Sequence, residues 1–192
     1  VCALVGMFAR HLKLEGKLVR ILCVSGLLHD IGKLHIPTAI LTKNGMLTAE
    51  EIAVMQTHPR KGYDILAKRT GLPDIVGKVC LQHHEKLDGS GYPAGLKDGE
   101  IVAAARMVAI CDVFDALTSI RPYKKGSTPE TAAAMMATWK GHFDQMLLNK
   151  FFDCMGLQSP ERRMVANVSA QTAHAADEML GLSQADLDGF QF

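Results

Sequence analysis

Six residues of metal-ligand type stand in or beside strongly apolar segments. They are His29, Asp30, His58, His83, His84 and Asp112. Buried imidazoles and carboxylates need partners, and an unpaired buried carboxylate is costly, so such groups are normally paired or bound to metal. Alone, His58 has an ordinary explanation as a partly exposed histidine, and Asp112 has one as a hydrogen-bonded buried acid. Taken together, the six are most simply satisfied by shared cations.

The ligand types narrow the choice of metal. Imidazole with carboxylate and without thiolate suits iron, manganese, nickel or zinc, whereas calcium and magnesium prefer oxygen ligands. Adjacent residues of a helix point about 100° apart, so His83 and His84 are not expected to reach one ion from the same direction. We therefore expect them to bind different ions, with Asp30 bridging between ions in a polynuclear site.

Helices are expected to carry these residues, because apolar residues recur at helical spacing along most of the chain. The predicted helices cover residues 1–13, 17–31, 49–69, 74–85, 100–119, 129–139, 144–155 and 160–180. Thr48 and Thr128 are suitable residues for helix starts, and Pro59 is expected to break or kink the helix that contains His58. Residues 36–46 are expected to form a connecting loop. Because no strand alternation is found, the expected class is all-α.

A glycine-rich segment follows the two adjacent histidines. In "HHEKLDGSGYPAGL", residues 83–96, the glycines and Pro93 predict a sharp turn directly after His84. This loop is expected to shape the opening of the site. Tyr92 would pack or form a hydrogen bond there, or else act only as a structural residue of the turn.

The overall composition restricts the partners of the protein. Of its 192 residues, 48% are hydrophobic and 21% are charged, so a sizeable core is expected. The net charge of +1 provides no general attraction for a nucleic acid polymer or a membrane surface. The five cysteines are widely separated and form no Cys-x-x-Cys pair, which is typical of free thiols in a reducing compartment such as the cytoplasm. No apolar run is suited to spanning a bilayer.

Four motifs in order resemble the HD-GYP phosphodiesterases, a group within the HD superfamily of metal-dependent phosphohydrolases. They are "HDIGK" at 29–33, "THPRKGYDIL" at 57–66, "HHEKLDGSGYPAGL" at 83–96 and "ICDVFDALTSIRPYKK" at 110–125. The resemblance implies an HD-domain helical bundle with a glycine-rich GYP loop. It also implies two or three transition-metal ions, usually iron or manganese. The implied activity is hydrolysis of cyclic di-GMP to linear pGpG or GMP, as part of bacterial second-messenger signalling.

The same resemblance implies roles for individual residues. The implied metal ligands are His29, Asp30, His58, His83, His84 and Asp112, and Asp30 would be the bridging and catalytic carboxylate. Lys33 would act near the scissile phosphate. Arg121, Lys124 and Tyr92 would contact the substrate.

Other functions remain open at this point. A degenerate module could bind a cyclic dinucleotide or a diguanylate cyclase without turnover, and an HD hydrolase could act on a nucleoside phosphate. A phosphodiesterase could also prefer the hybrid cyclic GMP-AMP dinucleotide. Retention of six ligand-type residues and Lys33 favours an enzyme over a pure docking module.

The domain organisation is also an expectation. Residues 1–156 are predicted to form the catalytic domain, and residues 157–192 a C-terminal helix and tail packed on it. The resemblance implies a further histidine ligand at a position just before Val1, which either stands in a preceding segment or is absent from the protein. A sensory or receiver domain is expected upstream of Val1. Besides the cyclic dinucleotide, the expected partners are diguanylate cyclase domains and a second copy of the chain.

Overall fold

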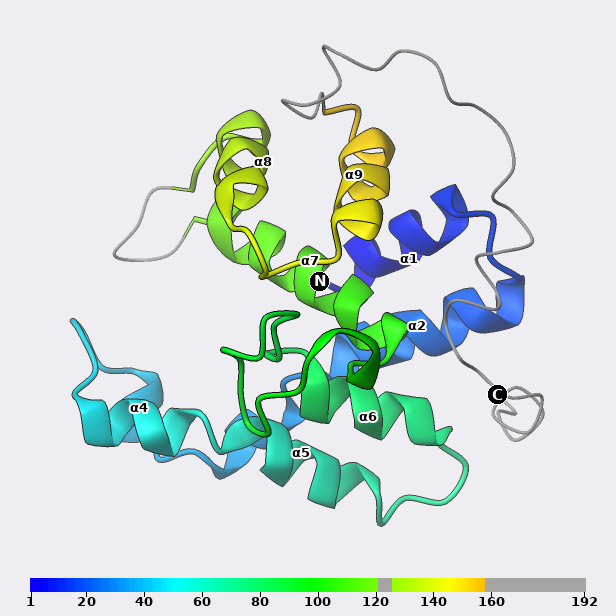
Figure 1. The fold of residues 1–192 in the computed structure, drawn as a ribbon. Helices are drawn as coiled ribbons and strands as arrows, with labels where there is room; N and C mark the ends of the chain where they lie inside the picture. Colours follow the sequence, from blue (N-terminus) through cyan, green and yellow to red (C-terminus); the bar gives the residue numbers. More distant parts are fainter. Residues whose placement is uncertain (121–125, 158–192) are drawn as a thin grey trace.

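The computed structural model describes residues 1–120 and 126–157, and Figure 1 shows their arrangement. The regular elements in this part of the chain are helices, so the expected all-α class is confirmed. In order, they are α1 (Cys2–His11), α2 (Gly16–Leu28), the 3₁₀ helix η1 (Ile31–His35), α3 (Thr38–Leu41), α4 (Ala49–Met55), α5 (His58–Leu66), α6 (Asp74–Gln82), the 3₁₀ helix η2 (Asp98–Glu100), α7 (Ala103–Thr118), α8 (Pro129–Thr138) and α9 (Gln145–Cys154).

Helix α7 is the central element of the bundle. It contacts α1, α2, α6, α8 and α9, and its buried residues include Ile110 and Phe114. Phe151 of α9 lies edge-on to both Phe8 of α1 and Phe114 of α7, with ring centroids 5.3 and 5.1 Å apart. This aromatic contact joins three helices that are far apart in the sequence. These aromatic contacts therefore fix the position of α7, which contributes one residue to the site described below.

A second group of helices lies on the other side of α7 (Figure 1). Helix α2 packs against α1 and α6, while α5 packs against α6 and η1. The glycines of η1 and α5 permit a very close approach. A Cβ atom added to Gly32 would lie 2.5 Å from the amide nitrogen of Gly62 and 2.9 Å from the carbonyl carbon of His58. The sequence after α2 is thereby held directly against the first turn of α5.

The helix boundaries follow from local chemistry at several predicted positions. Thr48 forms a capping box with Glu51, and the side chain of Thr128 accepts a hydrogen bond from the amide of Thr131. The helix expected over residues 49–69 is interrupted, and α5 begins at His58 with Pro59 in its first turn. A proline is well tolerated there because its missing N–H has no intrahelical partner. The predicted starts and the predicted break are confirmed.

Two other expectations were less accurate. Residues 36–46 are not only a loop, because Thr38–Leu41 form α3. In addition, the preceding residues Ile31–His35 form the 3₁₀ helix η1. The helix expected over 100–119 begins later, at Ala103, after η2. Both errors concern short helical turns, which carry too few residues to show a periodic pattern.

Some sequence predictions lie outside the described residues. These include the helix expected over 160–180 and the contacts expected for Arg121 and Lys124. The proposed boundary between residues 156 and 157 also stays a prediction. Within the part of the chain that the structure describes, no helix is long and apolar enough to cross a membrane.

Candidate metal centre

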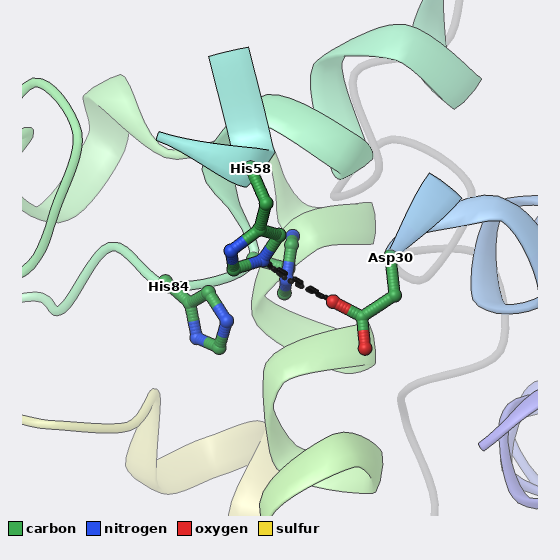
Figure 2. Close-up of side chains that lie close together, drawn as sticks. Asp30, His58 and His84 are labelled. Carbon is green, nitrogen blue, oxygen red and sulfur yellow. Dashed lines mark hydrogen bonds and ion pairs between the residues drawn. The ribbon is translucent and has the colours of Figure 1, made fainter. Parts of the chain in front are cut away.

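The six ligand-type residues come together from four parts of the bundle. His29 directly follows α2, and Asp30 directly precedes η1. His58 is the first residue of α5, His83 and His84 directly follow α6, and Asp112 lies within α7. Figure 2 shows Asp30, His58 and His84 converging from separate elements. Five of the six residues lie at or beside helix ends, and Asp112 alone comes from the middle of a helix.

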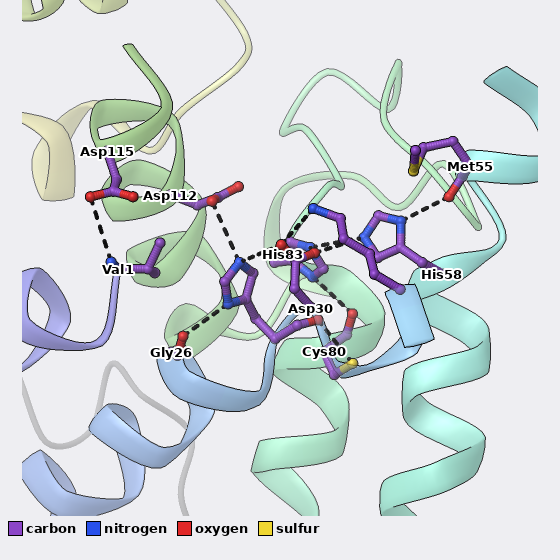
Figure 3. Close-up of polar contacts among 11 residues, drawn as sticks. Val1, Gly26, Asp30, Met55, His58, Cys80, His83, Asp112 and Asp115 are labelled. Carbon is purple, nitrogen blue, oxygen red and sulfur yellow. Dashed lines mark hydrogen bonds and ion pairs between the residues drawn. The ribbon is translucent and has the colours of Figure 1, made fainter. Parts of the chain in front are cut away.

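Asp30 lies at the middle of the cluster. Its Oδ1 atom lies 3.2 Å from Nε2 of His58 and 3.7 Å from Nε2 of His83, as Figure 3 shows. Its Oδ2 atom lies 3.3 Å from Nε2 of His29, which in turn lies 3.4 Å from Oδ1 of Asp112. One carboxylate therefore faces two separate groups of ligand-type atoms, which is the arrangement that a bridging ligand requires.

Four of these residues offer ligand atoms around a common position. Asp30, His58, His83 and His84 each present one such atom, and these atoms lie within 4.8 Å of one another. Both histidines lie directly after α6, which ends at Gln82, and their expected binding to different ions stays a prediction. Their ring centroids are 4.1 Å apart. His83 keeps helical backbone angles as the C-cap of α6, and the two rings nevertheless lie close together.

Three histidines are oriented in the same way by the main chain. Nδ1 of His29 donates to the carbonyl oxygen of Gly26 (2.9 Å), Nδ1 of His58 to that of Met55 (2.8 Å), and Nδ1 of His83 to that of Cys80 (2.8 Å). Because a carbonyl oxygen can only accept, the proton is on Nδ1 in each ring. The Nε2 atoms then face Asp30, and a cation bound between them would meet Nε2 of each ring. This is the tautomer that an Nε2 metal ligand requires.

The protonation states also favour metal binding. Burial raises the pKa of Asp30, but the close imidazoles of His29, His58 and His83 outweigh it and hold this pKa well below its usual range. Burial lowers the pKa of His83, and burial together with the charges of His83 and His58 lowers that of His84 to about 2. An ionised carboxylate beside neutral imidazoles is the state in which these side chains bind a cation.

His29 and Asp112 form a different environment. Burial lowers the pKa of His29, but its contacts with Asp112 and Asp30 outweigh burial and raise it to about 9. Positive charge is therefore favoured between these two carboxylates, and either a proton or a metal cation can supply it. Nε2 of His29 and Oδ1 of Asp30 are also buried without a hydrogen-bond partner of good geometry among the described residues. The donor set and these two atoms fit a metal cluster.

Other predicted site residues lie around the cluster. The ammonium group of Lys33 lies 2.5 Å from Oδ2 of Asp30, and its side chain is 40% exposed. The ring of Tyr92 stacks on that of His84, with centroids 4.7 Å apart and planes inclined by 27°. Lys33 and Tyr92 are thus beside the ligand-type residues, as expected. Their roles in substrate binding and catalysis stay predictions.

Glu85 was not identified from the sequence. Its side chain is buried, and its two carboxylate oxygens accept hydrogen bonds from the amides of Ala94 (2.7 Å) and Leu96 (3.0 Å). The available signal was an acid placed between two candidate histidine ligands and a glycine-rich loop whose amides can donate to it. A further missed contact is the thiol of Cys80, which donates to the carbonyl oxygen of His29 at 3.0 Å.

The family comparison agrees with this geometry. The HD domain family matches residues 1–147, so the chain belongs to this family of helical domains. The HD-GYP protein Bd1817 from Bdellovibrio bacteriovorus has a similar fold, with a TM-score of 0.66 at 23% identity over 81% of this chain and 50% of that chain. The recognition of the HD-GYP group is confirmed by the family match together with its relatives.

Curated relatives show closer sequence similarity. The cyclic di-GMP phosphodiesterase PA4108 of Pseudomonas aeruginosa is 46% identical over 157 residues, which cover 82% of this chain and 38% of that protein. The 3'3'-cGAMP-specific phosphodiesterase 2 of Vibrio cholerae is 43% identical over 123 residues, which cover 63% of this chain and 24% of that protein. The chain thus spans well under half the length of these relatives.

Proposed function

We propose that this chain is the catalytic part of a metal-dependent phosphodiesterase that hydrolyses cyclic di-GMP to linear pGpG or GMP. The main support is the arrangement of the histidines, since Nε2 of His29, His58 and His83 faces the shared carboxylate of Asp30 while Nδ1 of each ring donates to a main-chain carbonyl oxygen. A structural ion pair would have no need of three imidazoles in the metal-binding tautomer. The similarity to a cyclic di-GMP phosphodiesterase supports the choice of substrate.

The proposed metal ligands are His29, Asp30, His58, His83, His84 and Asp112. Two or three ions of iron or manganese suit this set, because its donors are imidazole and carboxylate and none is a thiolate. When bound, such ions provide water of lowered pKa and positive charge for the attacked phosphodiester. The two oxygens of Asp30 face different groups of histidines, so Asp30 is the proposed bridging ligand.

Lys33 is proposed to stabilise the phosphate as negative charge develops during the reaction. Its ammonium group is next to the cluster, and its exposure leaves it accessible to a phosphodiester that approaches from solvent. Arg121 and Lys124 are proposed to bind phosphate, and Tyr92 to border the substrate. The five cysteines are free, which suits a reducing compartment and supports a cytoplasmic location.

The proposed partners follow from the same assignment. A sensory or receiver domain upstream would control the site, and diguanylate cyclase domains or a second copy of the chain would be binding partners. The similarity to a 3'3'-cGAMP-specific phosphodiesterase supports a second candidate, namely hydrolysis of the hybrid cyclic GMP-AMP dinucleotide. Both candidates use the same metal cluster and differ only in base recognition.

A direct assay tests these proposals. The protein is purified without chelator, supplied with manganese or with ferrous iron under anaerobic conditions, and incubated separately with cyclic di-GMP, 3'3'-cGAMP and linear pGpG. Products are resolved by chromatography. We expect linear products from a cyclic substrate, and none from the Asp30→Ala variant. Binding of cyclic di-GMP without cleavage of any of the three compounds would favour a degenerate binding module.

A further inference from the structure

His84 differs from the other three histidines of the cluster in how its ring is held. His29, His58 and His83 each donate from Nδ1 to a main-chain carbonyl oxygen. For His84, no hydrogen bond from the ring is found to any residue that the structure describes. Its imidazole instead faces the Tyr92 ring, at 4.7 Å between centroids and 27° between planes. Ring contacts therefore hold this imidazole: Tyr92 stacks on it, and the rings of His83 and His58 lie 4.1 and 5.0 Å away between centroids.

The position of Tyr92 depends on the main chain around it. The amide of Tyr92 donates to the carbonyl oxygen of His84 at 3.2 Å, which ties the loop to the ligand segment on one side. Gly91 is crowded against that segment, because a Cβ atom added there would lie 2.5 Å from Cα of Glu85 and 2.6 Å from the carbonyl oxygen of His84. The loop thus passes directly over the residues that carry the imidazoles.

Glu85 holds the chain on the C-terminal side of Tyr92. Glu85 is only 4% exposed. Its two carboxylate oxygens accept hydrogen bonds from the amides of Ala94 and Leu96, which lie two and four residues after Tyr92. Buried charged acceptors of this kind make strong hydrogen bonds, and the loop amides would otherwise be unpaired. Since Glu85 is adjacent to His84 in the chain, it joins the loop to the very turn that presents the ligand.

We infer that Glu85 is a positioning residue, which holds Tyr92 against the His84 imidazole so that this ring is fixed for metal binding. Tyr92 thereby orients the ring of His84, just as the carbonyl oxygens of Gly26, Met55 and Cys80 orient the rings of the other three histidines. Groups that orient a ligand in this way commonly change metal affinity about 10–100-fold when they are removed. The inference depends on the metal centre of the proposed function but not on the identity of the substrate.

Manganese binding by the full chain tests this inference without any turnover. We expect Glu85→Ala and Tyr92→Ala to weaken Mn²⁺ binding about 10–100-fold by calorimetric titration. Tyr92→Phe should bind Mn²⁺ as the wild type does, because the ring remains. Glu85→Gln should lie between wild type and Glu85→Ala, because its amide keeps one acceptor oxygen. Wild-type affinity in both alanine variants would overturn the inference.

A matched control is available in the same segment. Glu100 also accepts a hydrogen bond from a loop amide, that of Lys97 at 2.8 Å, but Glu100 is exposed and, among the described residues, accepts no hydrogen bond from residues 92–96. Glu100→Gln should leave Mn²⁺ affinity unchanged. If Glu85→Ala does not fold, Tyr92→Leu decides the question, because it removes the ring while every loop hydrogen bond to Glu85 can persist.

A spectroscopic measurement separates orientation from general stability. In the zinc-loaded protein, long-range ¹H–¹⁵N spectra of the imidazoles report the tautomer of each histidine. Glu85→Ala and Tyr92→Ala should change or broaden the His84 signals and leave those of His29, His58 and His83 in place. Equal changes at all four rings would contradict a specific role at His84. If these results hold but no cyclic dinucleotide is cleaved, the proposed substrate is wrong and the positioning role stands.

Discussion

Lys33 and His58 contact opposite oxygens of the same carboxylate. The ammonium group of Lys33 lies 2.5 Å from Oδ2 of Asp30, while Nε2 of His58 lies 3.2 Å from Oδ1. Asp30 therefore connects an exposed positive charge with a buried group of imidazoles. This division predicts different consequences when Asp30 and Lys33 are replaced.

Replacing Asp30 should remove the metal itself. Asp30→Ala deletes the oxygens that face His29, His58 and His83, so the remaining ligands lose their common anionic partner. We expect stoichiometric metal in the wild type and loss of metal together with loss of hydrolysis in the variant. Elemental analysis beside a cyclic di-GMP assay measures both. An Asp30→Ala protein that keeps its full metal content would contradict the bridging assignment.

Replacing Lys33 should preserve the metal and lower the turnover. Lys33→Ala removes the electrostatic contact proposed between Lys33 and the phosphate, and such losses typically reduce the rate about 10²–10³-fold. Lys43 provides the control, because it also forms an ion pair at 2.5 Å, with Glu51, outside the cluster. Lys43→Ala should change neither kcat nor KM. Comparable rate losses in both variants would argue against a specific role for Lys33.

Gly32 should be required for the close approach of η1 and α5. A Cβ atom there would lie 2.5 Å from the Gly62 nitrogen, so Gly32→Ala must push the two segments apart. Overpacking of this kind typically costs about 1–3 kcal/mol in the free energy of unfolding. It should also weaken Mn²⁺ binding, because Asp30 and His58 lie on the separated segments. At Gly99, a Cβ atom would meet nothing within 4 Å, so Gly99→Ala is the control in urea unfolding and metal titration.

Removal of metal should destabilise the fold as well as abolish activity. A ligand that binds only the folded state stabilises it by about 2.7 kcal/mol when present at 100 times its dissociation constant. We therefore expect a chelator to lower the Tm of the wild type and to leave the Tm of Asp30→Ala nearly unchanged. Differential scanning calorimetry with and without chelator makes this comparison. An equal decrease in both proteins would show that the chelator acts elsewhere.

The sequence predicted the fold class and the starts of several helices, because these depend on periodicity and on local side chains. Thr48, Thr128 and Pro59 all act as expected within a few residues of their own positions. The six ligand-type residues were identified as a set because polar residues in apolar helices need partners. The structure brings these six together, while their assignment as ligands stays a proposal.

Other features depended on geometry that no local pattern contains. The rings of His83 and His84 lie close together directly after α6, which ends at Gln82. Glu85 reaches amides nine and eleven residues further along the chain, and this contact exists only after the loop has folded back. A sequence pattern locates the end of a helix only to within a residue or two, and a shift of that size changes the direction expected for adjacent side chains.

The carbonyl oxygens that orient His29, His58 and His83 belong to Gly26, Met55 and Cys80. Every amino acid carries such a carbonyl, so these three hydrogen bonds do not themselves require a particular side chain at residues 26, 55 and 80. The constraint falls on the path of the main chain and on whatever preserves that path. His84 lacks a main-chain acceptor of this kind among the described residues, and its proposed orientation depends on two side chains, those of Tyr92 and Glu85. Substitutions around this centre should therefore differ in their effects. A single substitution in the turn after α6 is expected to change the metal affinity.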